Sequence, residues 1–87
     1  MELKILDFKA KWCAPCVAMS PILDEVEKET GVEIRKIDVD DNEEMVIAYG
    51  IRNIPTLIFI KDNEIVDKVT GTISKEILIN KINEYSK

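Results

Sequence analysis

The chain has 87 residues, of which 46% are hydrophobic and 33% charged, and its net charge is −5. A chain of this length supports one hydrophobic core, so we expect a single domain over residues 1–87. The composition excludes a disordered or membrane-spanning protein, and the acidic balance argues against a nucleic-acid surface, which needs clustered Lys and Arg.

The N-terminal stretch from Met1 to Phe8 lacks the basic start and the long apolar run of a signal peptide, and no later stretch approaches transmembrane length. We therefore expect a cytoplasmic protein with no membrane partner. Cys13 and Cys16 are the only cysteines of the chain. In a reducing compartment, a lone CxxC pair more often performs thiol exchange than staples a fold.

The first predicted element is a strand from Leu3 to Ala10, whose nearly continuous apolar run is typical of a strand buried on both faces. Asp7 interrupts that run. A buried carboxylate is costly unless it is solvated, paired or protonated, so its presence favours a functional role. The alternative is that the side chain reaches water at a sheet edge.

The second predicted element is a helix from Pro15 to about Thr30, ended by Gly31. Cys13 and Cys16 then lie on one face of its first turn, close enough to form a disulfide. Unpaired N–H groups at the helix start stabilise a thiolate at Cys13, which we expect to be the more exposed sulfur and the nucleophile. Cys16 is placed to attack a mixed disulfide formed by Cys13. Pro15 fits the first turn, where its missing N–H costs nothing.

Three other interpretations of the cysteine pair remain open. Half of a zinc site would need two further ligands, and the chain has no histidine and no third cysteine, so only a dimer would complete it. A purely structural disulfide across so short a loop would contribute only about 2 kcal/mol. Two ordinary buried thiols would not explain the adjacent tryptophan and the intervening proline.

The rest of the chain predicts further strands and helices. Lys36 lies in the second strand, residues 32–39, and Asp40 to Asn42 supply N-cap candidates for a short helix that Gly50 ends. The third and fourth strands, residues 57–60 and 64–69, form a hairpin, and a last helix follows Ser74. We predict an α/β fold of order β-α-β-α-β-β-α, with a four-stranded mixed sheet covered by helices on both faces. Cys13 would lie at the carboxyl end of the first strand, where sites of α/β sheets are found.

The chain resembles the thioredoxin family over almost its whole length. The residues that carry the resemblance are Asp7-Phe8, Trp12-Cys13-Ala14-Pro15-Cys16, Pro21-Ile22-Leu23, Lys36, Asp38, Tyr49-Gly50-Ile51-Arg52, Ile54-Pro55-Thr56 and Gly71. This set of motifs, in order and nearly in spacing, is far more specific than the CxxC pair alone.

The resemblance implies a thioredoxin fold and a disulfide reductase with no bound cofactor or metal, whose redox-active disulfide joins Cys13 and Cys16. Asp7 would accept a proton from Cys16, with Lys36 as its neighbour, and the bond before Pro55 would be cis, beside the sulfurs. The substrate-binding residues would be Trp12, Ala14, Pro15, Ile54, Pro55 and Gly71. An extended substrate would pair with the main chain at Ile54.

The expected partners are disulfide-containing proteins and an NADPH-dependent thioredoxin reductase, and we expect a monomer. The chain departs from the family pattern in starting after the usual leading strand and helix, in Ala14 where glycine is usual, and in Val17 where a basic residue is common. These departures concern the electron donor and the redox poise. Two alternatives are a glutathione-dependent, glutaredoxin-like enzyme and a thioredoxin-fold binding module with redox-switched affinity.

Overall fold

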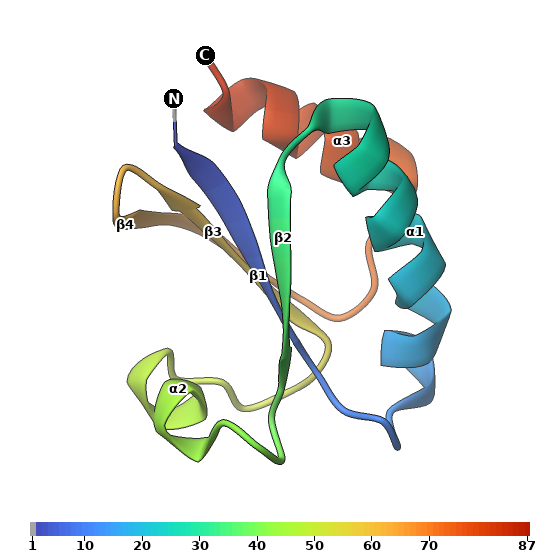
Figure 1. Ribbon diagram of the computed structural model, residues 1–87, viewed down its shortest axis with the longest axis vertical. Coiled ribbons are helices and arrows are strands. Elements are labelled where there is room, and N and C mark those ends of the chain that lie inside the picture. Colours follow the sequence, from blue (N-terminus) through green and yellow to red (C-terminus); the bar gives the residue numbers. More distant parts are fainter. Residues whose placement is uncertain (1) are drawn as a thin grey trace.

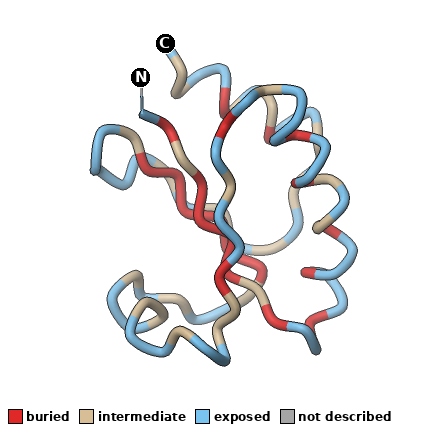
Figure 2. The backbone as a smooth tube through the Cα atoms, in the orientation of Figure 1, coloured by how far each residue is buried: buried red, intermediate tan, exposed pale blue. Residues whose placement is uncertain are grey.

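The computed structural model describes residues 2–87, which form a four-stranded mixed sheet of order β2-β1-β3-β4 (Figure 1). The central strand β1 (Leu3–Lys9) runs parallel to β2 (Glu33–Asp38) and antiparallel to β3 (Thr56–Lys61). The outer strand β4 (Glu64–Thr70) is antiparallel to β3. Buried residues concentrate along β1 and β3, the two inner strands (Figure 2).

Helices cover both faces of this sheet. The helices α1 (Ala14–Thr30) and α3 (Lys75–Tyr85) lie on one face, and the short α2 (Glu43–Ala48) lies on the other (Figure 1). Alternate residues of β1 supply the two cores: Leu3 and Ile5 pack with α1 and α3, whereas Leu6 and Phe8 pack on the α2 side. The predicted fold class and element order are therefore confirmed.

Several predicted boundaries move by a residue or more. Helix α1 starts at Ala14 rather than Pro15, because Cys13 itself is the N-cap. Strand β2 is shorter than the predicted residues 32–39, and β3 and β4 are slightly longer than predicted. Asn42 is the N-cap of α2, but its side chain makes no capping bond and instead donates to the Asp38 carbonyl oxygen at 2.9 Å. Short polar side chains compete for backbone groups in this way, so their capping partners are hard to predict.

The β3–β4 hairpin closes through Asp62 and Asn63, both with positive φ, at 51° and 69°. Two successive left-handed residues match the right-handed twist of the flanking strands, and Asp and Asn tolerate this conformation. The predicted hairpin of these two strands is confirmed. No helix within residues 2–87 combines the length and apolarity needed to cross a membrane.

Neighbouring residues of α3 provide a test of the core. Leu78 is fully buried, whereas Ile77 is 52% exposed. We expect Leu78→Ala to lower the free energy of unfolding by about 2–5 kcal/mol, because it removes apolar contacts and leaves a cavity. Ile77→Ala, the matched control, should change it by about 0.5 kcal/mol. Urea unfolding followed by circular dichroism measures both, and equal losses would contradict this assignment of the buried face.

Candidate active site

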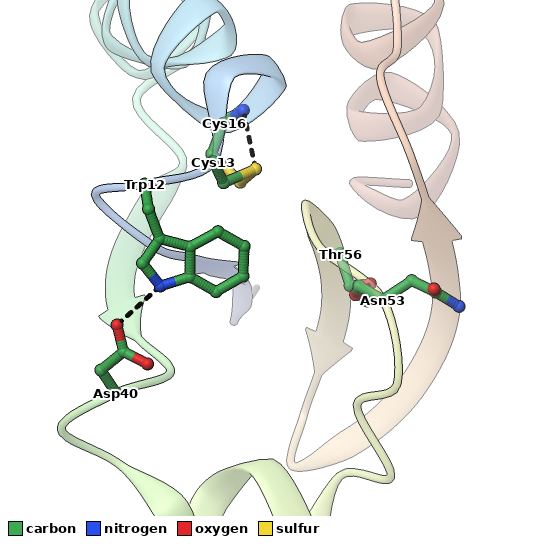
Figure 3. Close-up of a disulfide and its surroundings, with 6 residues drawn as sticks. All are labelled: Trp12, Cys13, Cys16, Asp40, Asn53 and Thr56. Carbon is green, nitrogen blue, oxygen red and sulfur yellow. Dashed lines mark hydrogen bonds between the residues drawn. A yellow bond between two sulfur atoms is a disulfide. The ribbon is translucent and has the colours of Figure 1, made fainter.

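Strand β1 leads directly into the cysteine pair. After β1 the chain turns through residues 10–12, and the Cys13 N–H donates to the Ala10 carbonyl oxygen at 3.2 Å. Cys13 and Cys16 form a disulfide at the start of α1, with their Cα atoms 5.3 Å apart (Figure 3). Ala10 is buried with both cysteines. The end of a buried central strand therefore sets the position of the disulfide.

The helix terminus distinguishes the two sulfurs. Cys13 is the N-cap of α1, and its Sγ accepts a hydrogen bond from the Cys16 backbone N–H at 3.2 Å. Pro15 has no N–H and lies in the first turn, where none is needed. In this disulfide state both cysteines are buried to nearly the same extent, with Cys13 6% and Cys16 4% exposed, so residue exposure hardly distinguishes them. The hydrogen bond distinguishes the two sulfurs better than exposure does, because it places a backbone N–H of the helix start at Cys13 Sγ.

Asp7 lies in the interior of the protein, on the same face of β1 as Leu3 and Ile5. It is 3% exposed, so the alternative in which its side chain reaches water at a sheet edge is wrong. The strand is central, and no edge is available. Burial raises the pKa of Asp7 from 3.8 to about 6, and the positive charges of Lys36 and Lys9 oppose that rise. The carboxyl group therefore exchanges its proton near neutral pH.

Lys36 lies directly across from Asp7 in the parallel register of β1 and β2. Its Nζ donates to Ser20 Oγ and to Asp24 Oδ1, both at 2.8 Å. Lys36 therefore acts on Asp7 through its charge, while its ammonium group is bound to α1. Ser20 in turn borders a cavity of about 240 Å³ that reaches Cys16 and is lined by Lys9, Ala10, Lys11, Cys16, Val17 and Ser20.

The loop before β3 covers the other side of the cysteine pair. The Ile54–Pro55 peptide bond is cis, and Ile54 packs against Ala10, Cys13 and Cys16. The Pro55 carbonyl oxygen accepts from the Gly71 N–H at 2.8 Å, which brings the start of β3 and the end of β4 together. Ala14 and Pro15 are exposed on the first turn of α1. Of the residues predicted for the substrate side, Ala14, Pro15 and Ile54 thus lie at the disulfide, and Pro55 and Gly71 are joined to each other.

Trp12 is 69% exposed and is held by a residue that sequence reasoning assigned only to a capping turn. Its indole Nε1 donates to Asp40 Oδ2 at 2.9 Å (Figure 3). The sequence could have predicted that Asp40 lies near Cys13, because Asp40 follows β2 and Cys13 follows β1, and the carboxyl ends of these parallel strands meet at one end of the sheet. A groove of about 210 Å³ runs from Trp12 to the loop before β3, lined by Trp12, Val39, Val46, Ile51, Arg52 and Ile54.

Known proteins resemble this chain in sequence and in fold. Residues 1–84 match the Thioredoxin family model. The chain belongs to the thioredoxin family. It is 42% identical over 83 residues to thioredoxin from Bacillus subtilis, covering 93% of this chain and 80% of that protein, and 43% identical to thioredoxin from Pyropia yezoensis, covering 93% and 78%. A mutant thioredoxin from Halobacterium salinarum superimposes with a TM-score of 0.95 at 35% identity, covering 99% of this chain and 76% of that one.

Membership of the thioredoxin family, together with the Cys13–Cys16 disulfide, makes the protein a thiol–disulfide oxidoreductase that reduces protein disulfides through a dithiol–disulfide cycle. The interpretation of the cysteines as a purely structural staple is thereby set aside. Within residues 2–87, no group of three or more potential metal-ligating side chains is placed to hold an ion.

The buried carboxyl group predicts a pH-dependent stability. Because the folded pKa of Asp7 lies above its unfolded value, the folded state holds this proton more tightly. The stabilisation is present below about pH 4 and is lost as the pH rises through about 6. We expect Asp7→Asn to raise the free energy of unfolding of the disulfide form by about 2–3 kcal/mol at neutral pH, where the wild type must bury a charge.

The pH series supplies the control. The gain from Asp7→Asn should vanish near pH 4, where the wild-type carboxyl is already neutral in the folded protein. Asp41→Asn removes an exposed carboxylate instead and should show no such profile. Urea unfolding at a series of pH values measures both variants, and a gain from Asp7→Asn that does not depend on pH would contradict the assigned burial.

Proposed function

We propose that Cys13 is the attacking thiolate, Cys16 the resolving thiol and Asp7 the group that accepts the proton of Cys16. The observation that supports these roles best is the hydrogen bond from the Cys16 N–H to Cys13 Sγ at the start of α1. After reduction, the same N–H favours negative charge on Cys13. Cys16 lies one helical turn further in and receives no such bond from the helix start.

The proposed cycle has two exchange steps. The Cys13 thiolate attacks one sulfur of a substrate disulfide, forms a mixed disulfide and expels the other substrate sulfur as a thiolate. Cys16 then loses its proton towards Asp7, directly or through a water, and attacks Cys13 Sγ. This second step forms the Cys13–Cys16 disulfide and expels the remaining substrate sulfur. Two electrons pass from the protein to the substrate.

The surface around the disulfide supports recognition of an extended polypeptide. We propose that substrates lie over Trp12, Ala14 and Pro15 on one side and along Ile54, Pro55 and Gly71 on the other. Pro55 has no N–H, so the sheet ladder ends there and the main chain beside it is free to pair with a substrate segment. Pairing through the main chain accommodates many different sequences.

We further propose that the protein works as a single-domain cytoplasmic monomer. We propose that an NADPH-dependent thioredoxin reductase reduces its Cys13–Cys16 disulfide after each cycle. The family membership supports this donor. Reduction of insulin in the presence of NADPH and a thioredoxin reductase tests it, with glutathione and glutathione reductase as the alternative donor. Activity with glutathione alone would instead favour the glutaredoxin-like alternative, and a lack of turnover with any donor would favour a binding module.

Single-cysteine variants test the assigned roles. We expect Cys13→Ser to abolish insulin reduction by dithiothreitol beyond the uncatalysed rate. Cys16→Ser should still attack substrates and then stall as a mixed disulfide, because no second sulfur can release it. Mass spectrometry of non-reduced samples measures the trapped adduct. Normal turnover by Cys13→Ser, or trapping by Cys13→Ser and not by Cys16→Ser, would reverse the roles.

The role of Asp7 predicts a separation of the two steps. We expect Asp7→Asn to slow release of the mixed disulfide by about 10²-fold, the effect of losing a positioned base, and to slow the first attack much less. In the wild type, the release step should also slow as the pH falls below about 6, where Asp7 becomes protonated. Stopped-flow mixing of reduced protein with a peptide disulfide resolves both steps. Unchanged release kinetics would leave Asp7 without a role in proton transfer.

A further inference from the structure

We propose that a cationic groove beside the active site, formed by Arg52 and Lys68, binds an acidic side chain of the substrate polypeptide. The groove has a volume of about 420 Å³ and is lined by Gly50, Arg52, Asn53, Lys68 and Thr70. The inference rests on the proposed function, because it assigns a preference to the substrate segment that lies along Ile54 and Pro55.

The groove lies between the loop that follows α2 and the edge strand β4. Lys68 pairs with Ile58 and Thr70 with Thr56 across the β3–β4 ladder, and directly paired residues point to the same face of a sheet. Ile58 packs in the core on the α2 side, so Lys68 and Thr70 lie on that side as well. Lys68 Nζ donates to the Gly50 carbonyl oxygen at 3.2 Å, which draws the ammonium group towards the loop.

The charges of the groove are not neutralised locally. Of the five lining residues, all within the described part of the chain, none is Asp or Glu. The ion pairs formed within residues 2–87 involve Lys36, Lys75 and Lys81, not Arg52 or Lys68. Asp67, next to Lys68 in sequence, points to the other face and is bound by Lys81 and Tyr85. In a protein of net charge −5, two cations without a carboxylate partner form a local site for an anion.

The groove adjoins the substrate side of the disulfide. Arg52 lines both this groove and the one that runs to Trp12, so its side chain borders the two grooves. Asn53 is anchored because its carbonyl oxygen accepts from Thr56 Oγ1, and it lies across the site from Trp12 and Asp40 (Figure 3). Ile54 and Pro55 follow directly in the chain, and Gly71 follows Thr70.

The position and charge of this groove indicate which substrate side chain it would bind. A substrate segment paired with the main chain at Ile54 would project alternate side chains to one side, towards Arg52 and Lys68. A carboxylate there would pair with both cations, whereas a Lys or Arg would meet two like charges. At the opposite end of the surface, Asp40 is occupied by the Trp12 indole. The charge pattern therefore favours Glu or Asp at a defined position beside the target cysteine.

Matched peptide disulfides test the proposal. Peptides that differ only in carrying Glu, Gln or Lys, scanned through each position flanking the target cysteine, are reduced by the full chain with dithiothreitol, a neutral reductant. We expect kcat/KM for Glu to exceed that for Gln by about two- to fivefold at one position, with Lys below Gln, as for a partly solvated ion pair. The preference should shrink in about 1 M salt, where the Debye length falls to about 3 Å.

Charge-matched variants locate the effect. Lys68→Gln and Arg52→Gln should each bring the ratio of kcat/KM for the Glu peptide to that for the Gln peptide towards one. The control is Lys28→Gln, at an exposed position on α1, which makes the same change in net charge and should leave this ratio unchanged. A ratio at or below one at every position, or an equal loss of the preference for Glu in all three variants, would overturn the proposal. Continued reduction of the Gln peptide in that case would still support the reductase function. If no peptide is reduced, the reductase function fails and the proposal fails with it.

Discussion

Cys13 is both the residue that ends the turn after β1 and the N-cap of α1, and the rest of the site depends on this double role. The buried strand holds the residue in place, while the helix start directs the Cys16 N–H at its sulfur. A hydrogen-bond donor that is already oriented needs no reorganisation when charge develops on that sulfur. The junction between β1 and α1 is therefore also the place where we propose that the thiolate is stabilised.

At Asp7, by contrast, the feature that shifts the pKa of the carboxyl group also lowers the stability of the folded protein. Ionising a carboxyl in the interior of a central strand costs about 2–3 kcal/mol, a substantial share of the stability of a small domain. The same burial moves its pKa to about 6, where it can take up and release a proton under ordinary conditions. Lys36 and Lys9 limit the shift without neutralising the group by a direct bond. A strand built only for stability would carry an apolar residue at this position.

The surface around the disulfide is electrically asymmetric. Trp12 and Asp40 form one end, held together by a hydrogen bond, and Arg52 and Lys68 form the other. In the proposed mode of binding, the loop with Ile54 and Pro55 offers main-chain groups to an extended segment, and such groups do not read its sequence. The proposed pairing of a substrate carboxylate with Arg52 and Lys68 would add a preference that main-chain pairing lacks. A broad reductase activity and a bias among substrates are therefore compatible in one small surface.

Local pattern determined much of this protein. The buried strand, the helix after the cysteines, the hairpin at Asp62 and Asn63 and the CxxC chemistry follow from short-range periodicity, turn residues and spacing, because each depends on near neighbours in the chain. Pairings distant in sequence were decided by the tertiary structure alone. Trp12 with Asp40, Lys36 with Ser20 and Asp24, and Lys68 beside Arg52 required the sheet order and register. The packing of Ile54 against both cysteines likewise required the tertiary structure, because the pairing of β3 with β1 carries the loop before β3 to the end of β1.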